Sequence, residues 1–207
     1  QEAMSHWAER PVIHLLLAMG GDDLPLLADT LDALGTQIYA DWQLTVLTDV
    51  PAPDGLDAAA SMLNWITLDD PQQVLEIANQ RVADVPADWV ALLDPGDRLP
   101  AHALYTCAEH IVLHPEWHFV YVDEDRIDAA GRRHDPRFKP DLNIELLRSI
   151  PYVGNFCLTR RETVLELGGF APLPGMETYD LAFKVLDRHG TQSIGHVSDV
   201  LYHRRSD

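Results

Sequence analysis

Residues 11–35 read PVIHLLLAMGGDDLPLLADTLDALG. The continuous apolar run at 11–18 predicts a strand that is buried on both of its faces. Apolar residues recur at helical spacing over 24–34, which predicts a helix that ends at Gly35. A strand followed closely by a helix is the repeating unit of parallel α/β sheets.

The same alternation continues along the chain and predicts the fold class. We expect strands at 43–47, 62–68, 89–93 and 118–122, and helices at 71–82, 100–114, 161–167 and 177–189. Alternating strands and helices at short spacing favour a mostly parallel sheet with right-handed crossovers. At 207 residues the chain fits one α/β domain, since a chain of this size buries roughly 70% of its unfolded surface.

The composition restricts the possible partners. A formal net charge of -18 repels phosphate backbones, so we expect no nucleic-acid partner. No apolar run approaches the roughly 20 residues that span a bilayer, so we expect no membrane span in this chain. Two widely separated cysteines, Cys107 and Cys157, suit a reducing cytoplasm. The start at Gln1 and the end just after VLYHRRSD lead us to expect a piece of a longer protein.

Four acidic loops should lie at the carboxyl ends of the strands, where parallel α/β sheets bind their ligands. They are expected at 19–23, 49–57, 94–99 and from Asp123 onward. The first of them contains GGDD, whereas nucleotidyl transfer would need a basic, glycine-rich phosphate loop there. The sequence therefore disfavours a nucleotidyltransferase.

Five segments of the second half carry a family resemblance. They are YVDEDRID (121–128), RFKPDLNIELL (137–147), YVGNFCLTRRETVLELGGF (152–170), METYDLAFKVLDRHG (176–190) and VLYHRR (200–205). In this order and spacing they resemble the acceptor half of family 2 glycosyltransferases, especially those that build bacterial surface polysaccharides. The resemblance implies a single Rossmann-like domain of the GT-A type over 1–207. Residues 11–118 would form its nucleotide-sugar-binding half and residues 119–207 its acceptor half.

The sequence DPGD at 94–97 stands where this family keeps its Asp-x-Asp motif. The resemblance implies that Asp94 contacts the donor and that Asp94 and Asp97 hold Mn²⁺ or Mg²⁺, for which carboxylate oxygens are suitable ligands. Gly96 occupies a position where the family often has a second acid. Proline followed by glycine is also the signature of a type II turn, so both interpretations stay open.

Three more residues are implied to bind the donor. Asp49 follows the second expected strand, Asn79 matches a helix asparagine used near the donor, and Asp123 begins an acidic cluster that would lie near the diphosphate. Each has a plainer interpretation. Asp49 could be a solvated turn residue, Asn79 a surface or capping amide, and 123–125 the start of a hairpin.

The sequence ETYD at 177–180 matches the segment that carries the family's catalytic base. The family has an aspartate where this chain has Thr178, and a neutral hydroxyl is a very poor base near pH 7. Glu177 is then the replacement base, with Asp180 as a second catalytic candidate. Both acids are also explained by the start of a helix, and Asp180 by an i,i+4 pair with Lys184.

His203 and Arg205 match the family's closing His-x-Arg element. The resemblance implies that His203 ligates the metal and that Arg205 pairs with the donor diphosphate. The alternative is a frayed basic end, which would be mobile without a donor.

Two functions remain. The first is transfer of a sugar from a nucleoside-diphosphate sugar to a glycan or lipid-linked glycan acceptor in polysaccharide biosynthesis, assisted by a divalent metal. The second is a catalytically degenerate domain that keeps the fold as a binding or assembly module. The first is the leading interpretation, and altered residues in all four family motifs support the second as its alternative.

Overall fold

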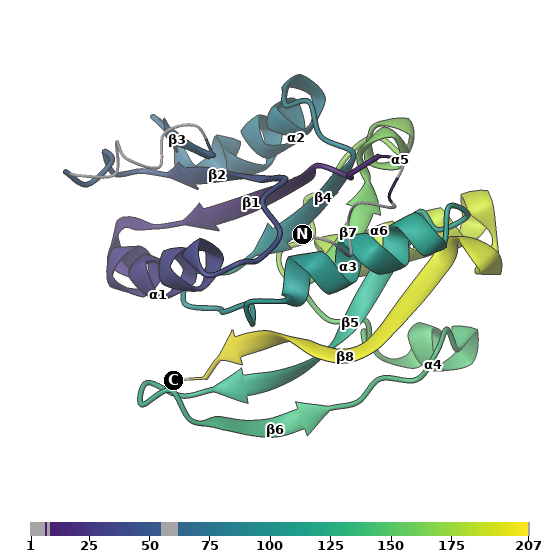
Figure 1. Cartoon of the computed structure of the whole chain (residues 1–207). Helices are drawn as coiled ribbons and strands as arrows, with labels where there is room; N and C mark the ends of the chain where they lie inside the picture. Colours follow the sequence, from purple (N-terminus) through teal and green to yellow (C-terminus); the bar gives the residue numbers. More distant parts are fainter. Residues whose placement is uncertain (1–6, 8, 55–61, 207) are drawn as a thin grey trace.

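The computed structural model describes residues 7, 9–54 and 62–206, which form one eight-stranded sheet covered by helices (Figure 1). The strands are β1 (Ile13–Met19), β2 (Trp42–Thr48), β3 (Leu63–Thr67), β4 (Trp89–Leu93), β5 (Phe119–Ile127), β6 (Arg133–Arg137), β7 (Cys157–Arg160) and β8 (Ile194–Arg205). The α-helices are α1 (Leu24–Gly35), α2 (Val74–Asp84), α3 (Ala103–Leu113), α4 (Ile144–Ser149), α5 (Arg161–Glu166) and α6 (Glu177–His189). Short 3-10 turns are η2 (Gly21–Asp23), η4 (Pro71–Gln73) and η5 (Thr191–Ser193).

The first four strands form the parallel part of the sheet, in the order β3-β2-β1-β4. In the centre, Leu15 of β1 pairs with Leu44 on one side and Ala91 on the other. All residues of β1 except Ala18 are buried, as expected for a strand covered on both faces. The predicted α/β class and mostly parallel sheet are thereby confirmed.

The second half adds strands of both directions. β7 lies between β4 and β5 and is antiparallel to both, β6 is antiparallel to β5, and β8 returns parallel to β5. The prediction of a loop from Asp123 onward was wrong, because β5 continues to Ile127 and contains the whole acidic cluster. The C-terminal basic run is likewise part of β8 and not a frayed end.

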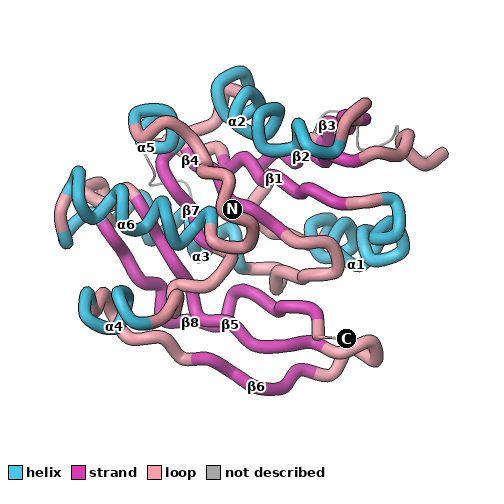
Figure 2. Tube along the Cα trace, turned by 180° about the vertical axis from the view of Figure 1, so that it is seen from behind, coloured by secondary structure: helices cyan, strands magenta, loops and turns pink. Residues whose placement is uncertain are grey.

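Side-chain alternation along the strands fills a core on each face of the sheet. Leu15 and Leu17 face the layer that contains α1 and α3, whereas Leu16 faces the layer that contains α2, α4, α5 and α6. Figure 1 shows the first layer in front, and Figure 2 shows the second from behind. The carboxyl ends of the parallel strands therefore open between two helical layers.

Candidate functional site

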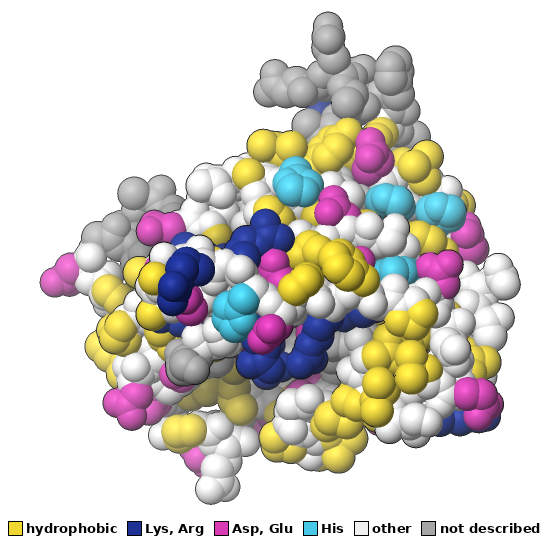
Figure 3. Space-filling model, turned by 90° about the horizontal axis from the view of Figure 1, so that it is seen from below, with side chains coloured by type: hydrophobic (Ala, Val, Ile, Leu, Met, Phe, Trp, Pro, Cys, Tyr) yellow, Lys and Arg dark blue, Asp and Glu magenta, His cyan; other side chains and the backbone are white. Residues whose placement is uncertain are grey.

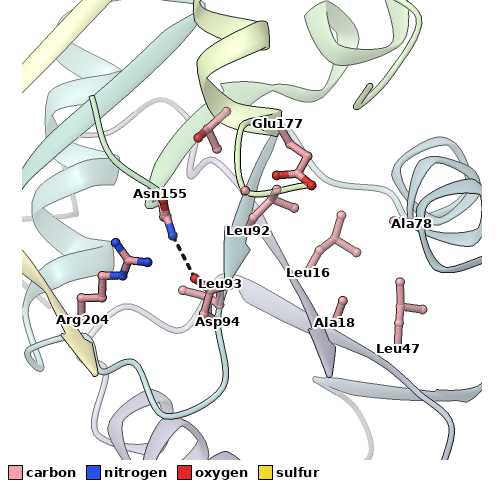
Figure 4. A pocket seen from close by; sticks show the side chains of 12 residues that line it. Leu16, Ala18, Leu47, Ala78, Leu92, Leu93, Asp94, Asn155, Glu177 and Arg204 are labelled. Carbon is pink, nitrogen blue, oxygen red and sulfur yellow. Dashed lines mark hydrogen bonds between the residues drawn. The ribbon is translucent and has the colours of Figure 1, made fainter. Parts of the chain in front are cut away.

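A cavity of about 270 Å³ lies at the carboxyl ends of β1, β2 and β4 (Figure 4). Its apolar lining consists of Leu16, Ala18, Leu47, Ala78, Leu92 and Leu93. Its more polar side consists of Asp94, Asn155, Gly175, Glu177, Thr178 and Arg204. This is the edge of the sheet where ligands of parallel α/β folds bind.

Asp94 comes directly after β4 and its carboxylate is at the cavity. Its Oδ2 accepts a hydrogen bond of 2.9 Å from the side-chain amide of Asn155, the residue two positions before β7. Asn155 was absent from our predicted site because an uncharged amide within YVGNF gave no chemical signal. Asn155 is a site residue because it lines the cavity and bonds Asp94, and both facts are visible only once the chain is folded.

Gly154 fixes the turn that presents Asn155. Its φ is 81°, a conformation that favours glycine, and a Cβ there would overlap the carboxylate of Glu124. The Thr178 hydroxyl donates a hydrogen bond of 3.0 Å to the Gly154 carbonyl oxygen. The start of α6 and the Asn155 turn are therefore tied together at the cavity.

Asp97 does not face the cavity, although it is only three residues beyond Asp94. Gly96 has a φ of 88° and the Asp97 N–H donates to the Asp94 carbonyl, so DPGD forms the predicted tight turn. The Asp97 side chain is buried, where its Oδ1 accepts from the Arg205 backbone N–H at 2.6 Å and its Oδ2 from the Tyr202 hydroxyl. Burial raises the pKa of this carboxyl to about 7, against the lowering effect of these two hydrogen bonds.

The C-terminal strand also places its basic residues differently from our prediction. His203 is buried and lies 2.6 Å from a carboxylate oxygen of Asp125, and Arg205 donates to Asp29 at 2.9 Å. Arg204 instead lines the cavity, because successive strand residues point to opposite sides. The resemblance implied His203 and Arg205 at the donor, and the residue between them lines the cavity instead.

The predicted metal ligands are not brought together. Of Asp94, Asp97 and His203, all within the described part of the chain, Asp94 alone lines the cavity. Within 7, 9–54 and 62–206, no group of three or more His, Cys, Asp and Glu side chains is arranged to hold a metal ion. The residues present therefore do not form the site for Mn²⁺ or Mg²⁺ that the resemblance implied.

The start of α6 presents one acid to the cavity. Glu177, the first residue of α6, lines it and is half-buried, whereas Asp180 is absent from the lining and pairs with Lys184 at 2.7 Å. The i,i+4 interpretation of Asp180 is confirmed. Thr178 also lines the cavity, but its hydroxyl donates its hydrogen bond to the Gly154 carbonyl oxygen.

The three predicted donor-binding residues outside DPGD occupy different surroundings. Asp49 is exposed just beyond β2 and does not contribute to the cavity lining. Asn79 uses its amide to bind the Phe170 backbone, accepting from the N–H at 2.8 Å and donating to the carbonyl at 3.0 Å. Its structural position therefore matches the plainer interpretation of an amide that secures a turn.

Asp123 is buried in β5 rather than displayed at a strand end. Its Oδ1 accepts from the Lys139 backbone N–H at 2.8 Å and lies 2.9 Å from Nε2 of His196. These contacts tie β5 to the segment after β6 and to β8. The carboxylate is not part of the cavity lining, and the implied place of Asp123 near the diphosphate stays a prediction.

Two curated proteins are similar in sequence, and no family model matches the chain. O-antigen biosynthesis protein RfbC of Myxococcus xanthus is 33% identical over 213 residues, covering 99% of this chain and 16% of RfbC. Uncharacterized protein y4gI of Sinorhizobium fredii is 28% identical over 206 residues, covering 95% of this chain and 22% of y4gI. The chain thus spans 16% and 22% of the length of these relatives.

Solved structures share the fold. TarS 1-349 of S. aureus in complex with UDP-GlcNAc has a TM-score of 0.69 and 15% identity, over 95% of this chain and 59% of that one. Mannosyltransferase PcManGT from Pyrobaculum calidifontis, in complex with GDP-Man and Mn²⁺, has a TM-score of 0.62 and 17% identity, over 95% and 57%. At these identities the likeness concerns the arrangement of the elements and not the chemistry of individual residues.

Proposed function

We propose, from the premise that this chain is a glycosyltransferase-like domain with a GT-A-like fold, that it binds a nucleoside-diphosphate sugar and transfers the sugar to a glycan. One observation carries the proposal. The cavity at the strand ends combines an apolar lining with a carboxylate, an amide and a guanidinium at its polar side. An apolar pocket with a few convergent polar groups is the usual form of a small-molecule site.

The two halves of the chain divide the substrate between them in this proposal. The nucleoside lies toward β1 and β2 in residues 11–118, with Asp49 beyond its edge, and Asp94 and Arg204 lie near the diphosphate. The sugar and the acceptor lie toward Glu177 in residues 119–207. Support for the donor class comes from TarS and PcManGT, which were solved with UDP-GlcNAc and GDP-Man.

Transfer requires a base for the acceptor hydroxyl. In the proposed step the hydroxyl oxygen bonds to the anomeric carbon, its proton moves to the Glu177 carboxylate, and the bond from that carbon to the diphosphate oxygen breaks. The nucleoside diphosphate leaves with the electron pair, and Arg204 stabilises its negative charge. Because Thr178 supplies no carboxylate, we propose slow turnover.

The acceptor class and location are inferred at a coarser level. RfbC is named for O-antigen biosynthesis, which supports a growing glycan or lipid-linked glycan in surface-polysaccharide synthesis as the acceptor. The described helices include none that is long and apolar enough to cross a membrane. We propose that the domain acts in the cytoplasm, where its two buried free thiols, Cys107 and Cys157, stay reduced.

A second candidate is a degenerate glycosyltransferase-fold module that binds or assembles without turnover. The observation that favours it is the contact of Thr178 with the Gly154 carbonyl, which gives the family's base position a structural role. Binding of a donor is compatible with both candidates. Release of nucleoside diphosphate in the presence of an acceptor distinguishes them.

Titration calorimetry with UDP, GDP and dTDP tests the proposed site. We expect saturable 1:1 binding of at least one of them, lost in Ala78→Phe because the added ring fills the apolar lining. Ala28→Phe, at an exposed position of α1, is the matched control and should bind as the unmodified chain does. Absence of binding for all three nucleotides, or equal binding by both variants, would contradict the proposed function.

A further inference from the structure

We infer that two neighbouring arginines, Arg126 and Arg204, hold the donor diphosphate in this chain without a divalent metal ion. The inference rests on the proposed function and specifies how that site neutralises its ligand. It departs from the metal-assisted binding that the fold resemblance implied. The two residues are called the arginine pair below.

The arginine pair is created by the register of β5 and β8. Arg126 is the Cα partner of Arg204 in this parallel pairing, and partnered residues of adjacent strands project to the same side of a sheet. The flanking pair behaves in this way, since Asp125 and His203 are also partners and their side chains lie 2.6 Å apart. Two guanidinium groups therefore share one side of the sheet.

Neither member of the arginine pair forms an ion pair with an acidic side chain in the described part of the chain, although nearby cations do. Arg98 pairs with Asp29 at 2.6 Å, and Lys139 pairs with Glu124 at 2.9 Å. Adjacent like charges repel each other. An anionic ligand placed between two such cations would relieve this repulsion.

The position of Arg204 connects this charge to the cavity. Figure 4 shows its guanidinium on the side of the cavity where Asn155 bonds Asp94. The backbone on both sides is fixed, because His203 and Arg98 exchange two hydrogen bonds of 2.9 and 3.0 Å and the Arg205 N–H is bound to Asp97. Figure 3 shows Lys and Arg side chains gathered on the face of the molecule seen from below, toward which β5, β6 and β8 lie.

Of the two carboxylates implied to hold a metal, Asp94 alone lies at the cavity. A Mg²⁺ or Mn²⁺ in a nucleotide site takes one or two carboxylates together with phosphate oxygens. Here Gly96 supplies no carboxylate, both oxygens of Asp97 accept hydrogen bonds, and Asp94 already accepts one from Asn155. A cation at Asp94 would also lie on the side of the cavity that Arg204 occupies. A planar guanidinium can pair with phosphate oxygens through two parallel hydrogen bonds, which replaces the metal's charge.

Calorimetry on the whole chain tests this inference. UDP, GDP and dTDP are titrated in Mn²⁺ and, separately, in EDTA, and the nucleotide that binds is used for the variants. We expect affinities within about 2-fold in the two buffers. Arg204→Gln should weaken diphosphate binding roughly 10- to 100-fold, the range expected for a lost charge-assisted bond. Arg126→Gln should weaken it less, because only Arg204 lines the cavity.

Two controls make the result specific. Arg148→Gln makes the same charge change on exposed α4, where Arg148 pairs with Glu145, and should leave binding unchanged. The parent nucleoside without phosphates should bind the Arg204→Gln variant as it binds the unmodified chain, which also shows that the variant is folded. Binding that needs Mn²⁺, or that survives Arg204→Gln, overturns the arginine pair but leaves the proposed function standing. If no nucleotide binds in either buffer, both the arginine pair and the proposed function are overturned.

Discussion

Glu177 and Asp180 are three residues apart on α6, yet their surroundings give them different chemistry. Glu177 lines the cavity, and no described side chain forms an ion pair with it. Asp180 has its charge compensated by Lys184 one helical turn later. A base must reach the proton that it removes, so in the proposed function we give this role to Glu177.

Glu177→Gln should therefore lower turnover roughly 10²- to 10⁴-fold with little change in donor affinity, since general-base assistance is worth about that much. Asp180→Asn is the matched control, an equal loss of charge on the same helix, and should keep turnover within about 3-fold. Release of nucleoside diphosphate in the presence of acceptor measures both. Equal effects of the two substitutions would exclude Glu177 as the base.

At the scale of elements, β8 decides which residues reach the cavity. It pairs with β5 along most of its length, and a register shift near Asp123 precedes the pairing of Asp125 with His203 and of Arg126 with Arg204. Hydrogen bonds from Arg205 to Asp97 and from Ser206 to the Ile127 carbonyl fix its end. The last residues of the described chain are thus fixed by hydrogen bonds to neighbouring segments, as residues inside a sheet are.

Hydrogen exchange should show this order without any donor present. The amides of His203, Arg205 and Ser206 are all bonded and should exchange at least 100-fold more slowly than those of Ala171 and Gly175 in the loop before α6. Asp97→Ala removes the acceptor for Arg205 and should accelerate exchange there, while amides of β1 stay protected. Fast exchange at 203–206 in the unmodified chain, slowed only by nucleotide, would instead support a mobile end.

The sequence predicted those strands and helices whose buried face follows from the pattern of apolar residues within the element itself. The apolar run at 11–18 and the spacing of 24–34 correspond to β1 and α1, because local patterns report which face is covered. The acidic cluster at 123–125 was misassigned to a loop. Some of its hydrogen-bond partners are distant in sequence, such as His203, which lies 78 positions from Asp125, and such partners are invisible until the strands are paired.

The site was predictable to a similar degree. Asp94 and Glu177 were found because DPGD and ETYD stand where the family keeps its Asp-x-Asp motif and its catalytic base. Arg204 was missed because the resemblance drew attention to its neighbours, His203 and Arg205. Asp97 was assigned to a metal because Gly96 stands where the family often has a second acid, and its contact with Tyr202, 105 residues away, is not visible in the sequence.

At the scale of the whole molecule, the cavity joins the two halves of the chain. β1, β2, β4 and α2 supply its apolar lining, while the Asn155 turn, α6 and β8 supply most of its polar side. The halves share one sheet, because β7 pairs with β4 on one side and β5 on the other. A change that loosens the sheet centre is therefore expected to open the cavity as well as to unfold the chain.

The centre of the sheet contains a titratable group, His14 of β1. Its side chain is fully buried, with Nε2 at 2.8 Å from the Thr45 hydroxyl oxygen and Nδ1 without a partner in the described structure. Burial, aided by the positive charges of Arg81 and Arg161, lowers the pKa of His14 to about 4. The imidazole is therefore neutral in the folded chain at neutral pH.

The stability of the chain should fall with acid for this reason. An unfolded histidine takes up a proton near pH 6.5, whereas the folded one does so near pH 4. The unfolded state thus binds more protons between these values, and stability that is complete above pH 6.5 is lost as the pH falls toward 4. The loss is on the order of 3 kcal/mol, since each pKa unit corresponds to about 1.4 kcal/mol.

Urea unfolding at pH 7, 6 and 5 measures this dependence. His14→Gln keeps a hydrogen-bonding group for Thr45 but cannot titrate, so its free energy of unfolding should change less between pH 7 and 5 than that of the unmodified chain. His102→Gln, at a half-exposed side chain near Asp199, is the control and should follow the unmodified chain. Parallel pH dependence of all three would mean that carboxylates elsewhere, and not the buried imidazole in β1, set the acid limit of the fold.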